Sequence, residues 1–146
     1  MSVKRRALKS ALKTAHREEV RAASLFNAIA SAVKDAQLLG TFLQFGAQEQ
    51  GGIATVEGLL EARGMGAPAL TPVTRIRAAF HGHTARVRPW RGVVEDALDR
   101  TEHRAQLMAE AASNARLAGD LDAARSLEEL RDNAGSQARW FREFLR

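Results

Sequence analysis

Residues 16–26 read His-Arg-Glu-Glu-Val-Arg-Ala-Ala-Ser-Leu-Phe, and the predicted fold depends on this stretch. It belongs to a longer series of positions that advance by four and three residues in turn, as one face of an α-helix does. The members of the series are Leu8, Leu12, Ala15, Glu19, Ala22, Phe26, Ile29 and Val33. All are apolar except Glu19. Because an isolated buried charge is costly, Glu19 must be paired, protonated or bound to a cation.

A second glutamate interrupts a second apolar face in the same way. A helix over residues 36–63 would place on one side Leu38, Phe42, Phe45, Glu49, Gly52, Val56 and Leu60. The pair Gly51-Gly52 costs about 1 kcal/mol each relative to alanine inside a helix. These glycines either permit close helix contact, leave room for another group or kink the helix. The sequence therefore predicts two helices, over residues 3–34 and 36–63, that each carry one inward carboxylate.

The remaining chain predicts a long connection and two more helices. Residues 64–92 begin with Gly64-Met-Gly-Ala-Pro and read as a crossover, followed by helices over residues 93–117 and 120–145. The third helix has a predicted inward face of Glu95, Leu98, Glu102, Ala105, Ala109 and Ala112. The fourth, with Asp120 as its N-cap, has an inward face that includes Ala124, Leu127, Ala134, Ala138, Phe141 and Leu145. Residues 1–146 thus form one all-α domain, a four-helix bundle of two antiparallel pairs joined by one long connection.

Composition limits the function. The chain has no cysteine, which excludes disulfides, zinc ribbons, thiol catalysis and iron–sulfur ligation. No apolar run approaches the roughly 20 residues that cross a membrane, and the first residues do not read as a secretion signal, so a cytoplasmic protein is expected. The sequence also contains no phosphate-binding glycine loop, no Ser/His/Asp set and no dinucleotide fingerprint.

Three segments resemble helices of the ferritin-like superfamily. In that superfamily an aromatic residue follows the first-helix ligand by seven positions, as in His16-x-x-Glu19-x-x-Ala22-x-x-x-Phe26. Residues 47–60, which contain Glu49, resemble the second-helix motif, and residues 130–139 resemble the fourth helix. These motifs are most similar to those of demethoxyubiquinone hydroxylase, and next to those of rubrerythrin. The resemblance implies a ferritin-like bundle built around a di-iron carboxylate site.

The sequence departs from this pattern at half of the ligand positions. The second-helix histidine is replaced by Gly52, and the fourth-helix glutamate and histidine are replaced by Ala134 and Gln137. The remaining candidates are Glu19, Glu49 and one of Glu95 or Glu102. These three carboxylates could hold a single iron or other divalent ion, with His16 or His103 completing the shell. The alternative is that the glutamates pair with Arg21, Arg104 or Arg131. We therefore assign no cofactor and describe the site as degenerate.

Three functions follow from these observations. The first is a non-catalytic or weakly metal-binding bundle that acts through its surface, as a homodimer. The second is a metal-dependent oxidoreductase or iron-handling protein in which Asp99 or Asp132 replaces a lost ligand. The third is a nucleic-acid-binding bundle, since the formal net charge is +5 and a basic stretch from Arg75 to Arg91 carries Phe80 and Trp90. For that stretch, and for the weak metal motif His81-Gly-His83 within it, a solvated connection is the favoured interpretation.

Overall fold

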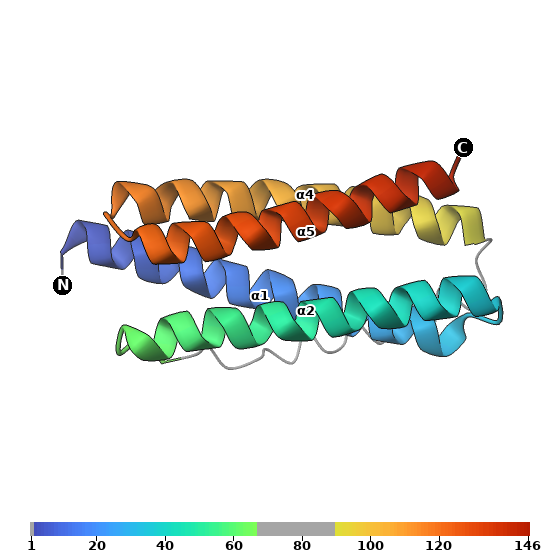
Figure 1. Cartoon of the computed structure of the whole chain (residues 1–146), viewed down its shortest axis with the longest axis horizontal. Coiled ribbons are helices and arrows are strands. Elements are labelled where there is room, and N and C mark those ends of the chain that lie inside the picture. The colour runs from blue at the N-terminus through green and yellow to red at the C-terminus, as the bar shows by residue number, and fades with distance from the viewer. Residues whose placement is uncertain (1, 67–89) are drawn as a thin grey trace.

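The computed structural model describes residues 2–66 and 90–146, which form four long helices. Their bounds are Val3–Ala32 (α1), Ala36–Ala62 (α2), Trp90–Leu117 (α4) and Leu121–Phe144 (α5). The helices run side by side along the molecule, with α1 antiparallel to α2 and α4 antiparallel to α5 (Figure 1). The predicted all-α four-helix bundle is confirmed. Residues 67–89 lie outside the described residues, and with them the histidine motif and most of the predicted crossover and basic stretch.

The ends of the helices follow the capping signals of the sequence. The side chains of Ser2, Asp35 and Asp120 each accept a hydrogen bond from the backbone of the first helical turn. Gly64 and Gly119 follow α2 and α4 with φ of 64° and 79°, a conformation that favours glycine. These caps fix where each helix begins or ends. Among the described helices, none is long and apolar enough to cross a membrane.

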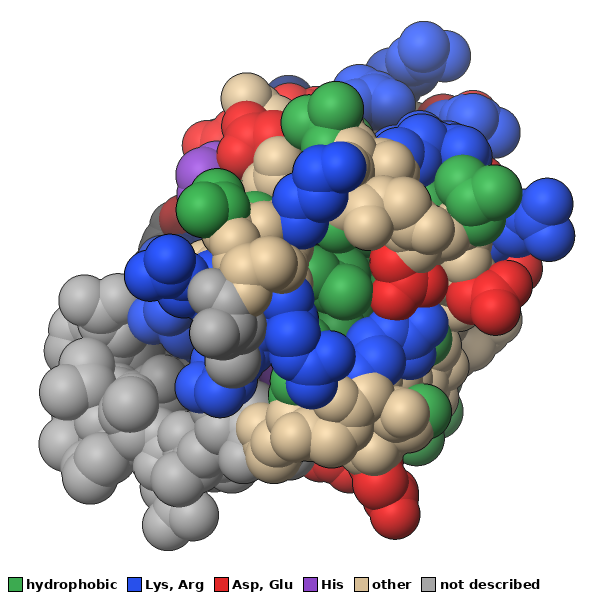
Figure 2. Space-filling model, turned by 90° about the vertical axis from the view of Figure 1, so that its left-hand side faces the viewer, with side chains coloured by type: hydrophobic (Ala, Val, Ile, Leu, Met, Phe, Trp, Pro, Cys, Tyr) green, Lys and Arg blue, Asp and Glu red, His purple; other side chains and the backbone are tan. Residues whose placement is uncertain are grey.

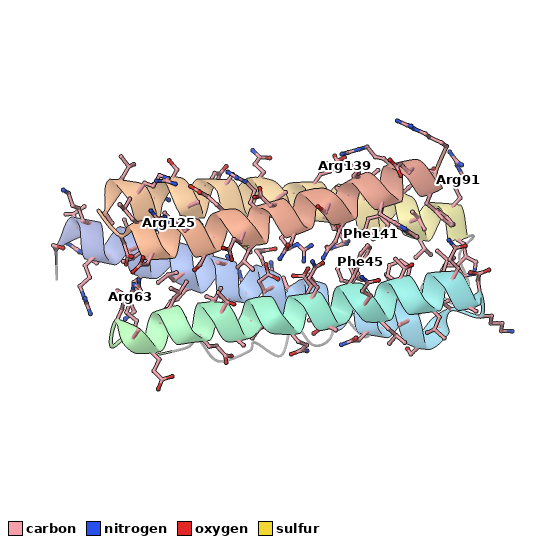
Figure 3. All side chains as sticks on the ribbon, in the orientation of Figure 1. Phe45, Arg63, Arg91, Arg125, Arg139 and Phe141 are labelled. Carbon is pink, nitrogen blue, oxygen red and sulfur yellow. The ribbon has the colours of Figure 1, made fainter. Side chains whose placement is uncertain are left out.

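The core consists of two hydrophobic clusters, one toward each end of the bundle. The cluster at the end where the chain begins includes Leu12, Leu60, Met108 and Leu127. The other is aromatic and centres on Phe26, Phe42, Phe45 and Phe141. In Figure 3, Phe45 and Phe141 meet between α2 and α5. The helices pack closely within each pair and across α1 and α4, whereas the contact between α2 and α5 is much less extensive.

The predicted inward faces agree with the structure for α1 and α2 but not for α4. Glu95 and Glu102 were expected inside and are exposed. The buried positions of α4 are Val93, Val94, Ala97, Thr101, Arg104, Met108, Ala111, Ala112 and Ala115. Most of these lie one position before the predicted ones, which corresponds to a rotation of about 100° around the helix axis. The prediction was wrong because alanines lie on several faces of this helix and an arginine lies on the buried one.

An ion pair joins the end of α2 to the turn between α4 and α5. The Arg63 Nε lies 2.5 Å from Asp120 Oδ2, and its Nη2 lies 2.8 Å from Asp120 Oδ1. Arg5 also donates to the Arg63 carbonyl at 2.7 Å, which brings the start of α1 to the same place. Figure 2 views this end of the bundle, where basic side chains surround small, separate hydrophobic patches. Arg5, Arg63 and Asp120 therefore form a clamp that joins three segments, the start of α1, the end of α2 and the turn between α4 and α5.

This clamp predicts an acid-sensitive contribution to stability. The hydrogen bonds from Arg63 lower the pKa of the Asp120 carboxyl below its ordinary value, despite the opposing effect of burial. A carboxyl with a lowered pKa stabilises the fold above its unfolded-state pKa of about 3.9, and this contribution is lost as the pH falls through the folded-state pKa. Asp120→Asn keeps an N-cap residue but loses the ion pair. It should cost about 1 kcal/mol at pH 7, and little at pH values below the folded-state pKa.

Urea unfolding at neutral and at acid pH measures this difference. The matched control is Asp99→Asn, which changes an exposed carboxylate on α4. An Asp120→Asn deficit that stays the same at both pH values would show that the ion pair does not stabilise the fold.

Candidate functional site

Four buried polar side chains meet between the two hydrophobic clusters, and each helix contributes one. Glu19 comes from α1, Glu49 from α2, Arg104 from α4 and Gln137 from α5. Their exposed fractions are 1%, 3%, 3% and 1%, respectively. Buried polar groups must satisfy one another because water does not reach them. We call this group the central polar layer.

The guanidinium of Arg104 lies between the two carboxylates. Its Nη1 is 2.6 Å from Glu49 Oε2 and 3.9 Å from Glu19 Oε2. Its Nη2 donates a hydrogen bond to Gln137 Oε1. The carbon at the centre of the guanidinium also lies 5.7 Å from the ring centroid of Phe26, within the range of a cation–π contact. Arg104 thus brings a positive charge to the place where the resemblance implied metal ions.

Gln137 connects this charge to the second helix. Its Nε2 donates to Glu49 Oε1 at 2.6 Å and to Gln48 Oε1 at 2.7 Å. Because an arginine only donates and a carboxylate only accepts, the amide of Gln137 has one permitted orientation. The amide oxygen faces Arg104 and the amide nitrogen faces Glu49. This residue holds the position at which the resemblance expected a histidine ligand.

The electrostatics of the layer are dominated by burial. Burial lowers the pKa of the Arg104 guanidinium below its ordinary value, while the Glu49 carboxylate opposes that shift. Arg104 Nη1 and Glu49 Oε2, which are 2.6 Å apart, form a close ion pair. Within the described chain, Arg104 Nε, Arg104 Nη1 and Glu19 Oε2 have no hydrogen-bond partner. The layer therefore holds its charges mainly through ionic attraction and the amide of Gln137.

Gly52 explains how the Glu19 carboxylate fits. A Cβ atom at residue 52 would lie 2.9 Å from Glu19 Oε2 and 3.1 Å from Leu130 Cδ2. The glycine thus leaves room for the carboxylate, one of the alternatives that the sequence left open. At the neighbouring Gly51, a Cβ would meet nothing within 4 Å.

The predicted metal-binding residues do not assemble. Glu19 and Glu49 share the central polar layer, but Glu102 and His103 are exposed, and Glu102 pairs with Arg142 at 2.7 Å. The ring of His16 is buried, yet its Nε2 lies 3.0 Å from Glu57 Oε1. In residues 2–66 and 90–146, no group of three or more His, Cys, Asp or Glu side chains could hold a metal ion. The rotated face of α4 is the physical reason, since it directs Arg104 inward in place of a carboxylate.

The other candidates lie on the surface. Asp99 is exposed, and Asp132 is exposed and accepts hydrogen bonds from Arg131. Arg21 pairs with Glu18 at 3.2 Å. Of the three arginines that the sequence offered as partners for the buried glutamates, Arg104 makes the contact.

From the sequence alone, no role could be assigned to Gln48 or to the amide of Gln137. For the buried face of α4 the sequence did carry a signal. The spacing of Thr101, Arg104, Met108 and Ala111 along this helix is that of one helix face.

A di-iron centre needs several carboxylates and imidazoles around two cations. Two carboxylates that already enclose a guanidinium do not fit it.

No family model and no curated protein matches the sequence. Among solved structures, the chain is similar to Dps from Thermosynechococcus elongatus, with a TM-score of 0.66 and 22% sequence identity. The similarity covers 99% of this chain and 96% of that one. The chain has a ferritin-like fold. The resemblance to the ferritin-like superfamily that the helix motifs indicated is therefore confirmed for the fold. The homodimer and the cytoplasmic location stay predictions.

Proposed function

We propose that this ferritin-like bundle does not perform di-iron chemistry and acts through its surface, with Arg104 as the resident cation of its interior. The observation that carries the proposal is the position of Arg104 Nη1, 2.6 Å from Glu49 and 3.9 Å from Glu19. A divalent ion that approached these carboxylates would meet a fixed positive charge. The protein's own side chain thus supplies the charge compensation that metal ions supply in di-iron bundles.

The energetics of burial support this assignment. Removing one partner of a buried ion pair typically costs 3–5 kcal/mol, because the other charge is left uncompensated. Metal entry would require Arg104 to leave both Glu49 and Gln137. Neither Gly52 nor Gln137 could offer an imidazole to hold the metal in return. Arg104 is therefore expected to compete effectively with divalent ions.

Anaerobic Fe(II) loading followed by desalting and elemental analysis tests the proposal. We expect well below one iron per chain, in the unaltered protein and in a Glu49→Ala variant alike. The control Glu102→Ala changes an exposed carboxylate and should give the same value. Two irons per chain, lost in Glu49→Ala but kept in Glu102→Ala, would refute the proposal and favour the hypothesis of a metal-dependent oxidoreductase.

One observation favours a second candidate, a weak single-cation site used in iron handling. The layer has two carboxylates but one guanidinium, and Glu19 Oε2 has no hydrogen-bond partner among the described residues. The same experiment separates the candidates, since about one metal per chain that depends on Glu19 would support the second.

A further inference from the structure

A small pocket opens between α2 and α5, two helices that make little contact with each other. Its volume is about 270 Å³, smaller than most pockets for drug-sized ligands. In a chain with 27% charged residues, every residue that lines it is uncharged. The lining consists of three amides, two hydroxyls and two aromatic rings: Gln44, Gln48, Gln137, Thr41, Ser136, Phe45 and Trp140.

The central polar layer sets the orientation of one of these amides. Gln137 has its amide nitrogen directed at Glu49, and that nitrogen also donates to Gln48 Oε1 at 2.7 Å. The oxygen of Gln48 is thereby fixed, and its Nε2 is left to donate elsewhere. Within the described chain, the amide of Gln44 and the hydroxyl of Ser136 form no hydrogen bond. The pocket thus presents both donors and acceptors.

The two aromatic rings form perpendicular walls. The centroids of Phe45 and Trp140 are 5.9 Å apart, with an angle of 88° between the rings. Trp140 is also stacked on Phe144, at 5.4 Å and 16°. These contacts restrict the rotation of the indole. A flat ligand could then lie against an apolar ring while its edge meets the amides.

We propose that this pocket binds a single unpaired purine base. Glutamine amides pair in two places with the edge of adenine, and aromatic side chains stack on bases. The uncharged lining suits the base rather than a phosphate. The base could belong to a free nucleoside or to single-stranded nucleic acid, which share this chemistry. The inference goes beyond the proposed function and does not depend on how much iron the bundle binds.

Fluorescence of Trp140 provides the test. The chain has two tryptophans, so a Trp90→Phe variant leaves Trp140 as the reporter. Adenosine should quench it in a saturable manner, and calorimetry on the unaltered protein should give the same affinity. Gln48→Leu should weaken binding about tenfold or more. The matched control, Gln50→Leu, changes an exposed glutamine of α2 outside the pocket and should bind adenosine normally.

Two further ligands make the result decisive. Tighter, salt-sensitive binding of a deoxyadenosine oligonucleotide would assign the base to single-stranded nucleic acid, and equal or weaker binding would assign it to a free nucleoside. Ribose alone should have no effect. The proposal fails if ribose binds as well as adenosine, if Gln48→Leu binds as the parent does, or if the folded protein gives no saturable response at millimolar adenosine.

Discussion

Replacing Arg104 with alanine should lower the free energy of unfolding by about 3–5 kcal/mol, the typical cost of breaking a buried ion pair. The variant would leave Glu19 and Glu49 buried with no positive charge, and Gln137 would lose the donor to its amide oxygen. For a chain of this size the melting temperature should fall by roughly 10 °C. Thermal and urea unfolding followed by circular dichroism measure both quantities.

Arg100→Ala is the matched control. Arg100 lies on the same helix, one turn before Arg104, and makes an exposed pair with Asp96 at 3.4 Å. Exposed pairs contribute about 1 kcal/mol or less, so this variant should melt close to the parent. A loss in Arg104→Ala no larger than in Arg100→Ala would mean that the guanidinium does not hold the carboxylates together.

Divalent cations should distinguish the two variants further. In Arg104→Ala, an added Mn²⁺ or Fe²⁺ could lie between the two carboxylates, and a ligand that binds only the folded state raises its stability. The melting temperature of Arg104→Ala should therefore rise with divalent ion concentration, while that of Arg100→Ala should not. Such a rise would show that a divalent ion can replace the guanidinium of Arg104 between the two carboxylates.

The sequence was informative where hydrophobic side chains mark one helix face. In α2 every predicted inward position is buried, including Glu49 and Gly52, because bulky side chains such as Phe42 and Leu60 leave one possible face. The same logic located Glu19 in α1. Both carboxylates of the central polar layer could thus be recognised as unusual before any tertiary contact was known.

It was less informative for α4, where small side chains leave the face ambiguous. Ala105 and Ala109 were predicted to lie on the inward face. In the structure both are only half-buried, and the inward face instead includes Ala97 and Ala115. Burial of Arg104 depends on acceptors from three other helices, so the spacing of residues along α4 is not enough to establish it. The role of Gln137 is likewise set by Arg104 and Glu49, far away in sequence. The sequence offered Arg104 as one of three possible partners of the glutamates, and the choice among them required the helices to be placed together.

Replacing Phe141 with alanine should also cost about 3–5 kcal/mol, because it removes a large buried ring from a packed core. Phe141 has no exposed surface, and its ring centroid lies 5.5–6.2 Å from those of Phe26, Phe42, Phe45 and Trp140. These rings come from α1, α2 and α5, so the side chain connects three helices. Urea unfolding should show a lower midpoint with a similar slope.

Phe144→Ala supplies the comparison within the same helix. Phe144 is 41% exposed and stacks on Trp140, so its removal should cost about 1 kcal/mol. Equal losses in the two variants would contradict the packing of the aromatic cluster. Since Phe26 contacts both Phe141 and the guanidinium of Arg104, the cavity in Phe141→Ala should also loosen the central polar layer. A double variant with Arg104→Ala should then lose less than the sum of the two single losses.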